Sequence, residues 1–195
     1  MRILSLFAFI LLIPCYAFCQ QPGKVLNFSQ VAWTITIPAS FTLIEAAEDS
    51  ARMARGLKVI EEANDIKVNA SSTITLISAI KDKFNYFNST ITPFDAKKDG
   101  DYSFVNQELK NLVYNTMALK MQKGELDSVS STQEVDGIVF DKFTLSINIP
   151  QKISFKMILM TKLYKGFQFG ITYLYLDDKT KEEIETMLKN SKFDK

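Results

Sequence analysis

The first half of the chain alternates between strand-like and helical spacing of its apolar residues. Residues 33–37 alternate apolar and polar side chains up to Pro38, a pattern typical of a strand with one buried face. Residues 48–62 place apolar side chains at helical spacing and predict a helix. Residues 73–80 are rich in β-branched side chains and predict a second strand. Residues 20–30 show neither pattern and are expected to form a short lead-in.

An aromatic, asparagine-rich segment and a long amphipathic helix occupy the middle of the chain. Residues 84–94 are expected to be extended, and residues 95–101 to form a polar loop. The strongest helical pattern covers residues 101–123, where Asp99 or Asp101 offers an N-cap. Its apolar stripe consists of Val105, Leu109, Leu112 and Val113.

The chain after Gly124 has the alternation typical of antiparallel strands. Asp136-Gly137 is a strong hairpin signal between strands expected over 127–135 and 138–147. Lys165-Gly166 is expected to turn the chain between two further strands. The first of these should bury one face, made of Ile153, Phe155, Met157, Leu159 and Leu163.

A final helix is expected after the last strand. Asp177 or Asp178 provides its N-cap, and Thr180 and Glu183 have the spacing of a capping box. The sequence contains no internal repeat and no interdomain linker. We therefore predict a single α+β domain, with one antiparallel β-sheet flanked by helices.

The N-terminal residues have the layout of a secretory signal. Arg2 precedes an apolar run over residues 3–13, which as a helix would cover only about half of a 30 Å hydrocarbon core. A basic residue, a short apolar run and small residues after it are typical of a signal peptide. We expect residues 1–19 to be removed and residues 20–195 to form the mature domain, secreted or periplasmic.

The two cysteines, Cys15 and Cys19, lie at the end of this segment. Ala17 and Cys19 supply the small side chains that signal peptidase reads, so cleavage is expected between Cys19 and Gln20. A lipid anchor on Cys19 is disfavoured because the bulky Phe18 precedes it, and a redox or metal-binding pair is disfavoured further. Mass spectrometry of the mature N-terminus distinguishes cleavage from lipidation.

Composition removes most catalytic chemistry. The chain has no histidine, which excludes the usual general base, the Ser-His and Cys-His pairs and most zinc sites. Removal of both cysteines would also remove thiol nucleophiles. The seven glycines form no phosphate-binding loop. We therefore expect no catalytic residue, no metal, no cofactor and no enzymatic activity.

Charge and hydropathy limit the partners. The chain has 23 basic and 22 acidic residues, so electrostatics give no reason to expect nucleic acid or an anionic membrane. No second apolar segment is long enough to span a bilayer. Another envelope or secreted protein is the expected partner.

One acidic segment resembles a calcium loop. Asp95, Asp99 and Asp101 surround a glycine, but Lys97 falls where a ligand belongs and Asn106 replaces the bidentate glutamate. The segment is therefore interpreted as a turn and a helix cap.

The aromatic residues are the best candidates for a binding site. Phe84, Tyr86, Phe87 and Phe94 lie in an irregular segment, where they could line a groove or pin the segment onto the core. A second aromatic stripe is expected to be core: Phe167, Phe169, Ile171, Tyr173 and Tyr175.

The whole layout resembles the PsbP-like fold, which the Ran-binding Mog family and DcrB-type envelope proteins share. The resemblance is carried by WTITIPASF at 33–41, the Asp136-Gly137 hairpin, GFQFGIT at 166–172 and the final helix running into NSKF at 190–193. Residues 76–78 and 87–95 are also similar to small exported bacterial proteins of unassigned role. The resemblance implies an antiparallel sheet flanked by helices and a role in binding or assembling other proteins.

Three functions are open at this point. The leading hypothesis is an exported, non-catalytic binding or assembly-accessory domain of the bacterial cell envelope. The alternative is a carrier of a small apolar ligand, held in a groove between the sheet and the helix over 101–123. A hydrolase using carboxylates or a Ser-Lys pair is disfavoured, because no residue spacing supports it.

Overall fold

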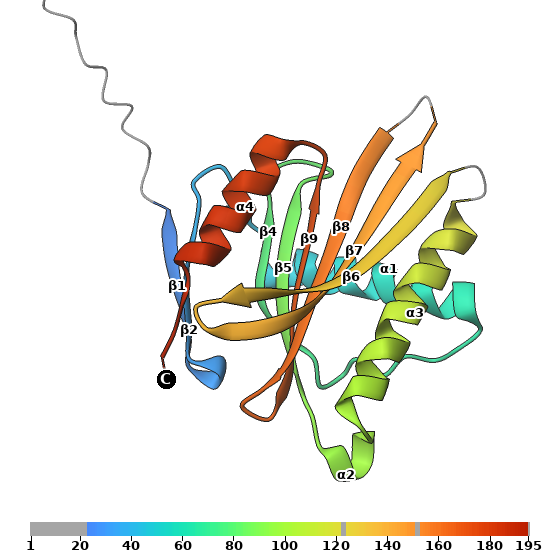
Figure 1. The fold of residues 1–195 in the computed structure, drawn as a ribbon, viewed down its shortest axis with the longest axis horizontal. Coiled ribbons are helices and arrows are strands. Elements are labelled where there is room, and N and C mark those ends of the chain that lie inside the picture. The colour runs from blue at the N-terminus through green and yellow to red at the C-terminus, as the bar shows by residue number, and fades with distance from the viewer. Residues whose placement is uncertain (1–22, 122–123, 151–152, 195) are drawn as a thin grey trace, which may run out of the picture.

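The computed structural model describes residues 23–121, 124–150 and 153–194, and these form a mixed α+β structure (Figure 1). The expected signal peptide, with Cys15, Cys19 and the cleavage site before Gln20, lies outside the described residues. Within them, no helix has both the length and the apolar character needed to cross a membrane.

A large antiparallel sheet forms the centre of the fold. Its strand order is β3-β4-β5-β9-β8-β7-β6. The strands are β3 (Thr42–Leu43), β4 (Ile74–Ile80), β5 (Tyr86–Pro93), β6 (Glu125–Val135), β7 (Ile138–Ile149), β8 (Ile153–Tyr164) and β9 (Phe167–Tyr175). All neighbouring pairs are antiparallel, as the sequence predicts.

A second sheet corrects the prediction of a single one. It pairs β2 (Trp33–Ile37) with β1 (Lys24–Phe28) on one side and with β10 (Lys192–Phe193) on the other. The expected lead-in over 20–30 is therefore a strand from Lys24 onward. The sequence did not predict this sheet because its strands come from opposite ends of the chain, and neither β1 nor β10 has a clear alternating pattern.

The helices are α1 (Ala46–Asn64), α2 (Ala96–Asp99), α3 (Tyr102–Lys120) and α4 (Asp178–Asn190). Among the described residues, three of the four helices begin within two residues of the expected positions, and α2 was not expected. Asp101 caps α3 by accepting a hydrogen bond from the Phe104 N–H at 3.1 Å. The segment expected to be a polar loop thus contains the short helix α2, with Asp95 as its N-cap.

The prediction of an aspartate N-cap for α4 is confirmed, whereas the capping box predicted at Thr180 and Glu183 is wrong. Asp177 is the N-cap, and its Oδ1 accepts from the Thr180 N–H at 2.8 Å. Glu183 instead binds the Lys81 Nζ at 2.6 Å, which ties α4 to the loop after β4. A carboxylate one turn earlier than Thr180 satisfies the free N–H groups of the first turn, so Thr180 is not needed as the cap.

Both faces of the large sheet are covered. Alternate residues of β7 contact α3 on one face, where Phe143, Leu145 and Ile147 pack with Val113 and Met117. The opposite face packs against α4 and the small sheet (Figure 1). The predicted aromatic stripe on β9 is core, and Phe169, Ile171, Tyr173 and Tyr175 are buried there.

The buried face predicted for β8 is wrong, because the opposite face of the strand is the more buried one. Ile158 and Met160 are almost fully buried against the main core, whereas Phe155, Met157 and Leu159 are partly buried on the α3 side. The reason is that the sheet has helices or strands on both sides, so alternation no longer separates buried from solvent-facing positions.

Two hairpins follow the predicted turn chemistry. Asp136 and Gly137 have φ values of 47° and 83°, and Lys165 and Gly166 have 50° and 80°. Two successive residues with positive φ are typical of the type I′ turn, whose twist matches that of the strands. The Asp136 carboxylate also accepts from the Phe193 N–H at 2.8 Å and from the Lys192 Nζ at 2.9 Å. The β6–β7 turn therefore fixes the C-terminal strand.

An aromatic cluster joins the two sheets. Trp33 of β2 stacks on Phe193 of β10, with ring centroids 5.9 Å apart and an interplanar angle of 11°. Phe169 of β9 meets Trp33 edge-on at 5.3 Å, and Phe140 of β7 meets Phe169 at 5.6 Å. These rings are 4% exposed or less. Rings of both sheets therefore share one core.

We predict that Phe193→Ala lowers the free energy of unfolding by about 3–5 kcal/mol, because it leaves a cavity among four aromatic rings. Phe104→Ala is the matched control, since Phe104 is 65% exposed. The control should change stability by less than about 0.5 kcal/mol. Urea denaturation measures both. Equal losses in the two variants would contradict the role of the cluster.

Candidate functional site

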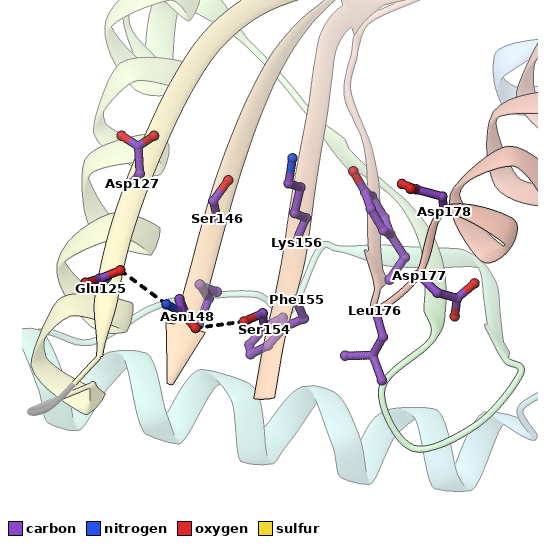
Figure 2. Close-up of a pocket in the computed structure, with 12 residues that line it drawn as sticks. Glu125, Asp127, Ser146, Asn148, Ser154, Phe155, Lys156, Leu176, Asp177 and Asp178 are labelled. Carbon is purple, nitrogen blue, oxygen red and sulfur yellow. Dashed lines mark hydrogen bonds between the residues drawn. The ribbon is translucent and has the colours of Figure 1, made fainter. Parts of the chain in front are cut away.

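A pocket of about 360 Å³ lies where four strands of the large sheet end beside the start of α4 (Figure 2). We call it the strand-end pocket. Its central row crosses the sheet in register, since Asp127 pairs with Ser146, Ser146 with Lys156 and Lys156 with Tyr175. The remaining lining residues are Glu125, Ile147, Asn148, Ser154, Phe155, Leu176, Asp177 and Asp178.

Hydrogen bonds hold the second row of the pocket. The Asn148 Nδ2 donates to Glu125 Oε2 at 3.2 Å, and the Ser154 hydroxyl donates to Asn148 Oδ1 at 2.7 Å (Figure 2). These bonds join β6, β7 and β8 across their ends, which fixes the position of the Glu125 carboxylate at the rim.

The pocket is acidic. It has four carboxylates, those of Glu125, Asp127, Asp177 and Asp178, and one ammonium group, that of Lys156. Within the described chain neither Lys156 nor Asp178 forms an ion pair at 4.0 Å or less. Burial chiefly raises the pKa of the Tyr175 hydroxyl, and the charges of Glu185 and Asp178 raise it further. The neutral Tyr175 can therefore offer a hydrogen bond and an apolar ring edge.

Ser146 and Lys156 lie directly opposite each other, which is the one arrangement here that a nucleophilic mechanism could use. In the part of the chain that the structure describes, no hydrogen bond joins their side chains. Lys156 is exposed to solvent. The pocket thus offers charges and apolar contacts suited to binding.

The four predicted aromatic site residues separate in the structure. Phe84 and Tyr86 line a cavity of about 410 Å³ on the sheet face that carries α1, and we call it the aromatic cavity. Phe87 is fully buried in the core. Phe94 packs edge-on against Tyr102 of α3, at a centroid distance of 5.6 Å. The other residues lining the aromatic cavity are Asp49, Arg52, Met53, Lys83, Asn88, Phe155 and Leu174.

The acidic calcium-like segment forms the short helix α2 and the N-caps of α2 and α3, where the sequence predicted a turn and one helix cap. Asp95 accepts from the Lys97 N–H at 3.0 Å, and the Asp99 carboxylate accepts from the Asp95 N–H at 2.7 Å. Among the described residues, no group of three or more His, Cys, Asp or Glu side chains is placed to hold a metal ion.

The sequence did not identify the strand-end pocket. One signal was present, because the Asp136-Gly137 turn fixes the register that places Asp127 opposite Ser146. The sequence could not show that α4 supplies part of the pocket, because no local pattern indicates that Asp178 lies near β6. The pocket depends on contacts between distant segments.

A carboxylate organises the loop between the aromatic cavity and the strand-end pocket. Asp82 Oδ1 accepts from the N–H groups of Phe84 and Asn85 at 2.9 and 3.0 Å, and Oδ2 accepts from Asn85 Nδ2 at 2.6 Å. The Phe84 N–H is the main cause that lowers the pKa of Asp82, followed by the Asn85 side chain. Asn85 Oδ1 accepts in turn from the Leu176 N–H at 3.0 Å. The loop is therefore anchored to a residue that lines the strand-end pocket.

This geometry predicts a pH-dependent stability. Folding lowers the pKa of Asp82, so the ionised carboxylate stabilises the folded state. This contribution to stability is fully present above the ordinary aspartate pKa of about 3.9, and it is lost as the pH falls through the lower pKa of the folded state. Asp82→Asn should thus lower the urea midpoint at pH 7, with a smaller difference from the wild type below about pH 4. Asp65→Asn is the control, because it is an exposed position where asparagine suits the left-handed backbone. A constant difference for Asp82→Asn between pH 7 and pH 3 would contradict the prediction.

Comparison with known proteins shows a similarity at the level of the fold. No family model matches the chain, and no curated protein sequence matches it. Among solved structures, it is similar to the solution structure of cyanobacterial PsbP (CyanoP) from Synechocystis sp. PCC 6803. The TM-score is 0.54 at 8% identity, over 94% of this chain and 99% of that one. The structure therefore has a PsbP-like fold, as its sequence pattern predicted.

Proposed function

We propose that this protein is an exported, non-catalytic binding domain that assists the assembly of other proteins in the bacterial envelope, and that it binds them through the strand-end pocket. The observation that carries the proposal is the composition of that pocket, which combines apolar side chains with four carboxylates and one lysine. The PsbP-like fold is compatible with an accessory role, although a fold does not by itself define a function.

The chemistry of the pocket defines the class of partner. Phe155 and Leu176 supply apolar surface, and a partner gains most by burying an apolar side chain there. The carboxylates at the rim attract lysine or arginine and repel acidic segments, so they select the partner. We therefore expect a polypeptide segment that combines basic and apolar residues.

A second candidate function rests on the aromatic cavity. Met53, Phe84, Phe155 and Leu174 give it an apolar lining, and Arg52 and Lys83 are also among its lining residues. About 410 Å³ lies within the range of small-molecule sites. Asp49 in the same lining carries the opposite charge, and Arg52 is already paired with Glu48 at 2.8 Å, so these features favour a small, mainly apolar ligand. The cavity lies beside α1, whereas the sequence placed the carrier groove beside the helix over 101–123.

The first proposal predicts a measurable peptide preference. A phage-displayed peptide library panned on the purified domain should yield sequences enriched in lysine or arginine together with apolar residues. Asp127→Asn and Asp178→Asn should each weaken binding of a selected peptide by about two- to fivefold, which corresponds to about 0.5–1 kcal/mol for an exposed ion pair. Higher salt should reduce this difference.

Glu108→Gln is the matched control for these variants, because Glu108 is an exposed carboxylate on α3 and does not line the strand-end pocket. Its affinity should equal that of the wild type at every salt concentration. Selection of acidic peptides, or equal losses in all three variants, would refute binding at the strand-end pocket.

The carrier alternative predicts a bound small molecule. Native mass spectrometry of the domain purified from its host should then show an added mass, and Met53→Trp should remove it by filling the cavity. Met117→Trp, on α3, is the control for a general effect of added bulk, and it should retain the ligand. A ligand-free mass in repeated preparations would exclude this function.

A further inference from the structure

The outer strand β6 presents a long, unprotected sheet edge. One side of β6 pairs with β7 over its whole length, from Glu125 to Val135. The other side has no neighbouring strand in the described sheet, where β6 is the last strand in the order. Residues 129–132 in its middle are all exposed. A row of backbone groups is therefore open to pairing.

The backbone of β6 confirms that this side is unpaired. N–H and C=O groups alternate between the two sides of a strand, so about half of those in β6 point away from β7. Among the described residues, no hydrogen bond from another backbone segment reaches them. The Ser128 N–H donates to the neighbouring Asp127 Oδ1 at 2.8 Å, which is a local partner that an incoming strand could replace.

The two edges of the sheet differ in a way that points to function. The opposite edge consists of the two residues of β3 and of residues 74–77 of β4, which β3 leaves unpaired, so it gives less continuous length for pairing. By contrast, β6 has eleven residues with the sequence ELDSVSSTQEV. It contains no proline, lysine or arginine, the residues that commonly prevent pairing at an edge. The unpaired stretch is thus longest along β6, where it covers the whole strand.

Charge selects among the strands that could pair with β6. The strand carries three carboxylates, Glu125, Asp127 and Glu134, and no basic residue. Pairing with β6 of a second copy would bring six carboxylates together without a compensating cation, and like charges across strands are destabilising. A basic segment has the complementary charge. Glu125 and Asp127 also line the strand-end pocket, so the open edge and the pocket form one continuous surface.

We propose that β6 accepts an extended basic segment of a partner protein as an eighth strand of the sheet, with alternate side chains of that segment directed to the strand-end pocket. Lysine or arginine would lie beside Glu125 and Asp127 on one face of the added strand, and its alternate apolar side chains would lie on the other face, which carries the partly buried Leu126. Main-chain hydrogen bonds give affinity in this mode, and side-chain contacts give specificity. The inference rests on the proposed binding role of the strand-end pocket and defines how the partner binds.

Hydrogen exchange tests the strand addition directly. The probe is a peptide of strand length with alternating lysine and valine, and a glutamate–valine peptide of the same length is its control. Saturating lysine–valine peptide should slow amide exchange in β6 at least about tenfold, as new backbone hydrogen bonds form. Exchange at β3, the other edge, should not change, and the glutamate peptide should have no effect.

Ser128→Pro provides an independent test. Proline removes an N–H that donates only to the Asp127 side chain in the described structure, and proline is tolerated on edge strands. Binding of the lysine–valine peptide should fall at least about tenfold, while Ser128→Ala should bind as the wild type does. Circular dichroism and the urea midpoint verify that both variants fold. If Ser128→Pro does not fold, the exchange pattern of the wild type decides.

The outcomes separate this inference from the proposed function. Salt-sensitive peptide binding that Asp178→Asn weakens, with unchanged exchange in β6, would overturn strand addition and leave the pocket as the binding site. Absence of binding to any basic peptide would overturn both. Dimerisation through β6 in sedimentation, lost in Ser128→Pro, would show that a second copy occupies the edge and would also overturn the proposal.

Discussion

The aromatic contact between Trp33 and Phe193 is the interaction on which the rest of the arrangement depends. It brings together strands from the two ends of the described chain, and Phe140 and Phe169 of the large sheet pack around it. The small sheet thereby becomes part of the main core. Buried aromatic groups contribute both apolar area and edge-to-face attraction, so this cluster stabilises a contact that backbone pairing over two residues of β10 could not hold.

The position of α4 follows from that core and creates the strand-end pocket. Ile184 and Leu188 are fully buried beneath α4, and Lys81 binds Glu183 on its outer side. The start of α4 is therefore held beside the ends of four strands, which places Asp177 and Asp178 opposite Glu125 and Asp127 in one pocket (Figure 2). Phe155 lines both this pocket and the aromatic cavity, so the two binding surfaces share one wall.

The similarity to cyanobacterial PsbP at 8% identity shows how little of a sequence a fold requires. At such distance the comparison supports the overall arrangement of strands and helices and assigns no individual residue a role. Binding residues are not constrained by the fold, because rim positions such as Asp127 and Asp178 contribute little to the core. The function of this protein must therefore be argued from its own pocket and its own open edge, and the fold supplies only the framework.

Local physics in the sequence was enough to predict the hairpins, the capped start of α3 and the buried stripe on β9, because turns, caps and alternation involve residues close along the chain. Asp136-Gly137 required positive φ, and Asp101 could only satisfy the N–H groups next to it. The small sheet, the second covered face of β8 and the strand-end pocket were decided by tertiary structure. The small sheet joins segments more than a hundred residues apart, the pocket joins β6 to the start of α4 about fifty residues later, and β8 has elements on both sides. No local pattern records which distant surface will cover a side chain.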